Sequence, residues 1–91
     1  MAITKELIRL KARRIADILP KREGLEVVLS VWNPGGGRNL YQLNWKEDET
    51  GGEWHIGYNC HIDGKSFYAF LEGIEAGIYE LERSINGAKG A

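Results

Sequence analysis

The most reactive side chains of this sequence are two histidines and one cysteine, at His55, Cys60 and His61. Histidine and cysteine together can bind zinc, and an imidazole beside a thiol can activate it as a nucleophile. Residues 53–62 alternate apolar and polar side chains, which predicts a strand. In a strand, His55 and His61 share a face but lie about 20 Å apart, too far to hold one metal. Cys60 points to the opposite face as a small core thiol, so we expect neither a metal site nor a catalytic cysteine.

A glycine-rich segment, Pro34-Gly-Gly-Gly-Arg38, could present backbone amides to a phosphate. A nucleotide-binding P-loop, however, joins a strand to a helix and carries lysine followed by serine or threonine. This segment lies between two runs that read as strands, which favours a hairpin loop. The carboxylate pairs at 72 and 75 and at 48 and 49 lie among polar residues, as solvated charges do. The sequence therefore predicts no enzyme and no cofactor.

Length and charge limit the classes of function. Ninety-one residues suffice for one domain, which we place at 1–86, with a flexible tail at 87–91. The formal net charge of −1 gives no global field toward nucleic acid or an anionic membrane. No apolar run approaches the roughly 18 residues of a membrane span. A single cysteine fits a reducing compartment, so we expect a cytoplasmic protein.

The first helix is predicted over 1–19. Thr4 is its expected cap and Pro20 its expected stop. Its densest apolar stripe consists of Ile8, Ala12, Ile15 and Leu19. A second apolar patch contains Ile3, Leu7, Leu10 and Ile18. This patch leaves room for a homodimer as well as a monomer.

Three strands are predicted at 25–32, 40–46 and 53–62, joined by loops at 33–39 and 47–52. The core side of the sheet is expected to carry Leu25, Val27, Leu29, Val31, Tyr41, Leu43, Trp45, Trp54, Ile56, Tyr58, Cys60 and Ile62. The opposite side is expected to face solvent or a partner, with Val28, Ser30, Trp32, Gln42, Asn44, His55, Asn59 and His61. The short loops make neighbouring strands antiparallel.

The second helix, over 63–85, shows the clearest period of the chain. Asp63 or Ser66 is its expected cap and Asn86-Gly87 its expected exit. Its apolar stripe consists of Phe67, Leu71, Ile74, Ile78, Leu81 and Ile85. One flank carries Ala69, Gly73, Ala76 and Gly77, which predicts close approach by the first helix. The other flank carries Tyr68, Glu72, Glu75 and Tyr79.

This order of elements predicts an α+β fold of two layers. A three-stranded antiparallel sheet with one apolar face closes most simply when both helices pack on that face. The layout is α-β-β-β-α.

Two function hypotheses follow from the surface. The first is a non-enzymatic protein-binding module, because tyrosine and tryptophan concentrate binding energy. Its predicted contact residues are Tyr68, Glu72, Glu75, Tyr79, Trp32, Glu47, Asp48 and Glu49. The alternative is nucleic-acid binding through the basic face of the first helix, because phosphate contacts need clustered cations. Its predicted contact residues are Lys5, Arg9, Arg13 and Arg38, with help from Lys21 and Arg22.

The layout resembles the double-stranded RNA-binding domain over most of the chain. That family relies on a lysine cluster at the start of its second helix, where this chain has Lys65, Ser66, Phe67, Tyr68 and Ala69. The size and layout are also similar to small phage and mobile-element accessory proteins, including anti-CRISPR inhibitors. This second resemblance implies a CRISPR-associated nuclease as the protein partner, so we expect protein partners ahead of nucleic acid.

Overall fold

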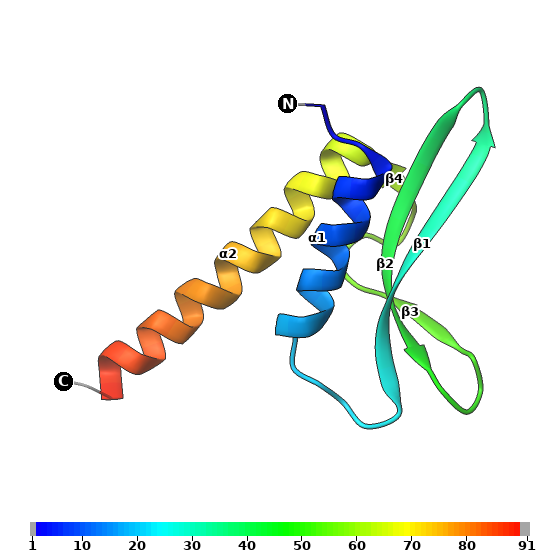
Figure 1. Cartoon of the computed structure of the whole chain (residues 1–91). Helices are drawn as coiled ribbons and strands as arrows, with labels where there is room; N and C mark the ends of the chain where they lie inside the picture. The colour runs from blue at the N-terminus through cyan, green and yellow to red at the C-terminus, as the bar shows by residue number, and fades with distance from the viewer. Residues whose placement is uncertain (1, 90–91) are drawn as a thin grey trace.

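The computed structural model describes the backbone of residues 2–89 and the side chains of residues 2–85. Its elements, in chain order, are α1 (Lys5–Ile18), β1 (Leu25–Gly35), β2 (Arg38–Glu47), β3 (Glu53–His55), β4 (Ile62–Asp63) and α2 (Gly64–Lys89). The helices and the antiparallel sheet form an α+β fold, as predicted. Both helices lie to one side of the sheet, and the second half of α2 extends away from it (Figure 1).

The first helix is capped by Thr4, as predicted. Thr4 Oγ1 accepts a hydrogen bond from Leu7 N at 3.2 Å, which satisfies one of the free amides of the first turn. The helix therefore starts at Lys5, later than the predicted start, while Met1 lies outside the described residues. It ends at Ile18, two residues before Pro20, because the residue before a proline avoids the helical conformation.

The hairpin between β1 and β2 is tighter than predicted. The two strands pair from Leu25 with Glu47 as far as Gly35 with Arg38, so only residues 36 and 37 form the turn. Gly36 and Gly37 both have positive φ, +69° and +75°, which a two-residue hairpin turn requires. The predicted loop at 33–39 is therefore wrong. A bulge between Trp32 and Gly35 lets the strand accommodate Pro34, which has no amide to donate.

The predicted strand at 53–62 is interrupted. β3 pairs with residues 44–46 of β2, the chain then leaves the sheet, and β4 rejoins β2 at Leu40 and Tyr41. Gly57, with φ +80°, lies in the intervening loop. Three side chains predicted in the core are consequently exposed: Trp54, Tyr58 and Cys60. Asn44, predicted on the open face, is instead buried.

The core lies where α1, β2 and the first half of α2 meet. Its buried apolar residues are Ile8, Ala12, Ile15, Tyr41, Leu43, Phe67 and Leu71. Along the predicted stripe of α2, Phe67 and Leu71 are buried, whereas Leu81 and Ile85 are exposed. The apolar core thus uses only the first half of this helix.

The two helices meet through the flank of α2 that carries Tyr68, Glu75 and Tyr79. The predicted approach of α1 to the glycine and alanine flank is therefore wrong. A Cβ atom added at Gly73 or at Gly77 would meet nothing within 4 Å.

The far end of α2 also differs from prediction. The helix continues through residues 86–87 and ends at Lys89, so the predicted tail begins with helical residues. Residues 90–91 of that tail lie outside the described part of the chain. Within residues 2–89, neither helix combines the length and the apolar character that crossing a membrane requires.

Candidate functional site

The histidines and the cysteine do not come together. His61 is tied to the sheet, since its Nε2 lies 2.8 Å from Ser30 Oγ and its ring packs edge-on against Trp32 at 6.0 Å. His55 and Cys60 are exposed on β3 and on the following loop. Among the described residues, no group of three or more histidine, cysteine or acidic side chains is placed to hold a metal ion.

Three of the four residues on the predicted tyrosine and glutamate flank of α2 contact α1, namely Tyr68, Glu75 and Tyr79. Glu75 Oε1 lies 3.2 Å from Lys11 Nζ, and its Oε2 lies 2.8 Å from Arg14 Nε. The Arg14 contact is close enough for an ion pair, but it lacks the direction of a hydrogen bond. Lys11 also lies 5.5 Å from the centre of the Tyr68 ring. Of the four predicted residues, Glu72 is exposed without such a contact.

Arg14 joins the same contact through Tyr79. Its Nη2 donates a hydrogen bond to the Tyr79 hydroxyl at 3.4 Å. This hydrogen bond and the charge of Glu75 raise the pKa of Arg14 above its ordinary value. Arginine is charged throughout the physiological pH range, and these contacts favour its charged form further.

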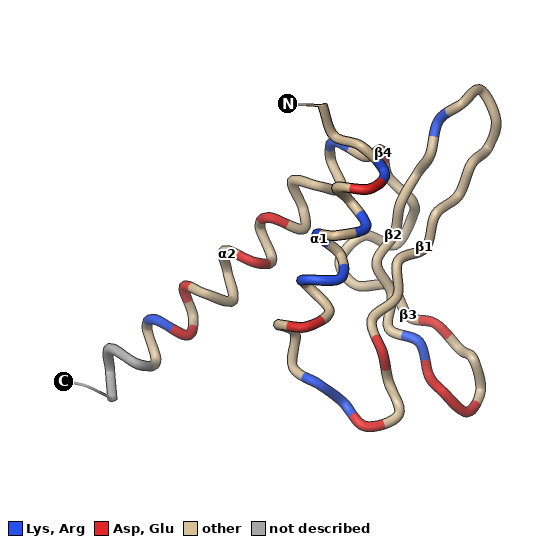
Figure 2. Tube along the Cα trace, in the orientation of Figure 1, with Lys and Arg blue, Asp and Glu red and all other residues tan. Residues whose placement is uncertain are grey.

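A hollow at one end of the sheet is lined by an exposed tryptophan and three glutamates. Trp54 on β3 is 52 % exposed and lines a hollow of about 430 Å³. The other lining residues are Glu23, Gly24, Leu25, Glu47 and Glu49. They come from the segment before β1 and the first residue of β1, and from the end of β2 and the β2–β3 loop, where acidic residues gather in Figure 2.

Backbone hydrogen bonds hold the walls of this hollow together. Asp48 N donates to Gly24 O at 3.0 Å, which fixes the β2–β3 loop to the segment before β1. Within that loop, Glu47 N donates to Gly52 O at 2.8 Å. Thr50 Oγ1 donates to Glu47 Oε2 at 2.7 Å. The carboxylates at 23, 47 and 49 take no part in the four ion pairs formed by the side chains of residues 2–85.

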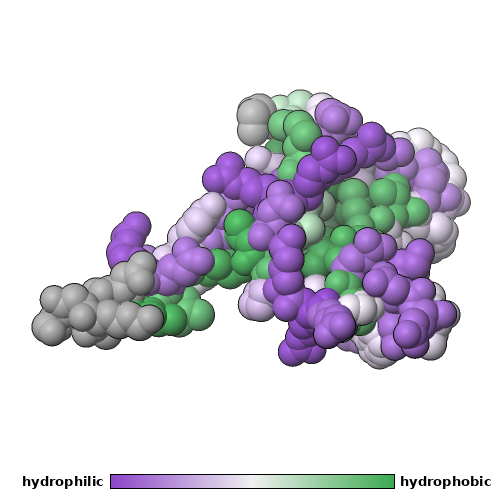
Figure 3. All heavy atoms as spheres, turned by 60° about the horizontal axis from the view of Figure 1, so that its bottom comes forward, coloured by the Kyte–Doolittle hydropathy of each residue, from purple (hydrophilic) through white to green (hydrophobic). Residues whose placement is uncertain are grey.

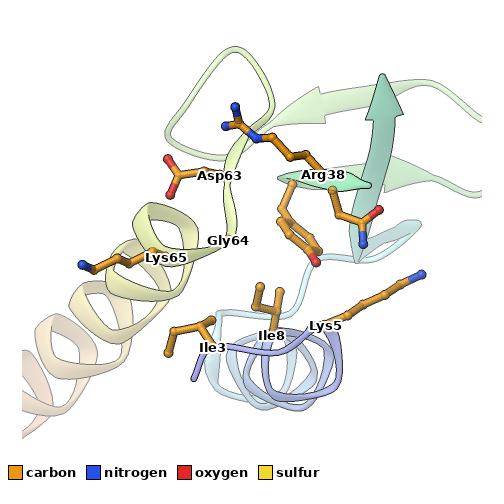
Figure 4. A pocket seen from close by; sticks show the side chains of 9 residues that line it. Ile3, Lys5, Ile8, Arg38, Asp63, Gly64 and Lys65 are labelled. Atoms are coloured by element: carbon orange, nitrogen blue, oxygen red, sulfur yellow. The ribbon is translucent and has the colours of Figure 1, made fainter. Parts of the chain in front are cut away.

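A second hollow, of about 540 Å³, lies where α1, β2 and α2 begin. Lys5, Arg38 and Lys65 each contribute a cation from a different element, and Figure 4 shows these side chains spread around the rim. Tyr41 and Ile8 line its apolar part. Asp63 Oδ2 accepts from Ser66 N at 3.0 Å and caps α2, as predicted. This hydrogen bond lowers the pKa of Asp63 below its ordinary value.

The predicted nucleic-acid residues are divided between two surfaces. Lys5 and Arg38 belong to the hollow at the helix starts. Arg9 and Arg13 instead border a groove between α1 and β1. The predicted basic face of α1, with Lys5, Arg9 and Arg13, is exposed along its length, but it does not form one cluster with Arg38.

Comparison of the chain with models of protein families, with curated proteins and with solved structures finds no match to any of them.

Sequence reasoning missed two residues of the acidic hollow, Trp54 and Glu23. The alternation of residues 53–62 assigned Trp54 to the core. The glycines at 51, 52 and 57 were the available signal, because glycine weakens a strand and often marks where it bends or ends.

Proposed function

We propose that the protein is a non-enzymatic protein-binding module whose contact surface is centred on Trp54. The observation that carries this proposal is a half-exposed indole that lines a hollow together with Glu23, Glu47 and Glu49. Tryptophan is enriched among the residues that dominate binding energy at protein interfaces. Its ring also attracts cations, best among the aromatic side chains. The partner segment is accordingly basic, with a lysine or arginine side chain entering between the carboxylates.

The other predicted contact residues fit this proposal to different degrees. Asp48 is exposed beside the hollow and adds negative charge to its surroundings. Trp32 is exposed on β1, but it packs against His61 rather than lining the hollow. Tyr68 and Glu75 are engaged with α1, so they contribute to the fold before any partner arrives.

Binding of a basic segment can be measured with short arginine-containing peptides and matched glutamate-containing peptides. In a ¹H–¹⁵N spectrum, the indole signal of Trp54 should shift with the arginine peptide alone. The variants Trp54→Ala and Glu47→Gln/Glu49→Gln should reduce binding at least about tenfold, as loss of a central contact residue does. Trp32→Ala is the matched control, since it removes an equally exposed indole elsewhere. An unshifted Trp54 signal, or full binding by Trp54→Ala, would refute the proposal.

The resemblance to anti-CRISPR proteins extends the proposal to one class of partner. A CRISPR-associated nuclease must hold nucleic acid, and the basic surfaces that do so suit an acidic hollow. Such a partner would place the protein in the cytoplasm. A cleavage assay with a guide-loaded nuclease should show inhibition by the wild-type protein and less inhibition by Trp54→Ala. Equal cleavage with and without the protein would exclude the nuclease tested.

A second candidate function is nucleic-acid binding, and the hollow framed by Lys5, Arg38 and Lys65 favours it. Three cations around one hollow can contact phosphates, and such binding weakens steeply as salt increases. Anisotropy with labelled duplex RNA and DNA at low salt should show weaker binding for Lys5→Glu/Arg38→Glu than for the control Lys46→Glu/Arg83→Glu, which reverses two exposed cations outside the hollow. Equal affinity of the two double variants would remove this candidate.

A further inference from the structure

The second half of α2 carries an apolar stripe that the fold leaves uncovered. Leu81 is 62 % and Ile85 is 46 % exposed, and Ile78 beside them is half-buried. Glu82 lies next to this stripe by helical spacing, because it is one residue from Leu81 and four residues from Ile78. Gly77 and Ser84 border the other side and leave room for a close approach. The segment therefore presents an apolar ridge with one acidic edge.

A groove of complementary character lies between α1 and β1. It has a volume of about 220 Å³, and it is lined by Arg9, Ala12, Arg13, Ala16, Val27, Leu29 and Leu43. The four α1 residues recur at the spacing of one helix face, with two alanines and two arginines. The alanines leave space for larger side chains. The groove is therefore apolar in its middle and basic along its α1 edge.

The ridge and the groove agree in length and in charge. The ridge from Ile78 to Ile85 and the α1 edge of the groove from Arg9 to Ala16 each span eight residues, about 12 Å at 1.5 Å per residue. The leucine and isoleucine of the ridge are larger than the alanines of the groove, and Glu82 carries the charge opposite to that of the arginine edge. Arg13 takes part in none of the four ion pairs within residues 2–85, so its charge is available.

We infer that the protein forms a symmetric homodimer in which the second half of α2 of each copy packs into the α1–β1 groove of the other. Apolar surface between α1 and the sheet and along the projecting part of α2 is visible from one side of the molecule in Figure 3. A two-fold axis can therefore bring both surfaces of each copy together. Such an arrangement contains the helix-in-groove contact twice, which helps to reach the roughly 800 Å² per copy of a standard interface. The inference is independent of the proposed function, because the Trp54 hollow takes no part in it.

Sedimentation equilibrium of the full chain tests the dimer. The wild-type protein should have twice the 10.2 kDa chain mass at micromolar to millimolar concentrations. Leu81→Glu/Ile85→Glu should be monomeric, with an unchanged far-ultraviolet spectrum because both side chains are exposed within one copy. Arg83→Glu is the matched control: it changes the net charge by the same amount from an 80 % exposed position on the opposite face. A monomeric wild-type protein, or a dimer that persists in Leu81→Glu/Ile85→Glu, would overturn the inference.

Charge reversal tests the groove. Arg13→Glu and Glu82→Arg should each weaken dimerisation about three- to tenfold, since they place like charges at the contact edge. The combined variant should recover much of the lost affinity, which a general effect on folding would not produce. Equal dissociation constants for the wild-type protein and all three variants would show that α2 pairs with another surface. In that case the groove is not the docking site.

Discussion

Glu75 on α2 lies 3.2 Å from Lys11 on α1, and their side chains are only 18 % and 15 % exposed. This contact joins residues 64 positions apart in the chain and sets which flank of α2 faces α1. Arg14 reaches the same carboxylate from a side chain that is 60 % exposed, where solvent screens the interaction. Lys11 therefore contributes more to the stability of this ion pair than Arg14 does.

Glu75→Gln should destabilise the protein by about 1–3 kcal/mol, because it leaves a mostly buried lysine without its counter-charge. The free energy of unfolding from urea denaturation measures this loss. Glu72→Gln, an exposed position on the same helix, should change it by less than about 0.5 kcal/mol. Equal effects of the two variants would mean that the Lys11 contact does not stabilise the helix pair.

Gly57 allows the loop between β3 and β4 to pass close to α2. A Cβ atom there would lie 2.6 Å from the Phe70 ring, and the residue has φ +80°. Gly57→Ala should therefore cost about 2–4 kcal/mol of unfolding free energy, from backbone strain and from the clash. Gly51→Ala separates these causes, since Gly51 has φ +71° but open space around it. It should cost only about 1 kcal/mol, and equal losses would contradict the Phe70 contact.

Asp63 makes stability depend on pH at the start of α2. The hydrogen bond from Ser66 lowers the pKa of Asp63 in the folded protein below its ordinary value of 3.8. The carboxylate therefore stabilises the fold fully above that ordinary value, and its contribution is lost as the pH falls through the lower folded-state pKa. Melting temperatures of the wild-type protein and Asp63→Asn, measured from pH 7 to pH 2, should converge or cross at the acidic end. A difference that stays constant with pH would exclude this role.

Cys60 should react in the folded protein. Its side chain is exposed in the loop before β4, so a thiol reagent such as Ellman's reagent can reach it without unfolding. The native rate should be within about tenfold of the rate in urea. Protection by several orders of magnitude would instead support the buried position that strand alternation predicts.

Periodicity predicted the two helices well because their core-facing residues recur regularly and their caps are local. Thr4 and Asp63 both act at the predicted ends. The alternation of apolar and polar residues at 53–62 wrongly predicted one continuous strand, because a loop can carry the same pattern by chance. The positive φ of Gly57 is a property of the fold, and the residue type alone only hints at it.

Which flank of α2 packs against α1 depends on an ion pair between residues far apart in the sequence. Small residues at 73 and 77 suggested a close approach, yet the pairing of Glu75 with Lys11 turned the opposite flank inward. The cations at 11 and 14 on α1 were the signal that could have predicted this. The hollow around Trp54 was less predictable, because its walls come from segments that only the folded sheet brings together.

The first part of α2 is buried and the last part is exposed, so the two parts of this continuous helix should open with different free energies. Up to about Ile74, opening the helix means breaking the core, so backbone amides there should exchange with deuterium only during global unfolding. Glu75 and Tyr79 still contact α1, but beyond Tyr79 no core or α1 contact among the described side chains opposes fraying in a single copy. Deuterium uptake along this helix therefore offers a direct readout of whether another chain has covered its far end.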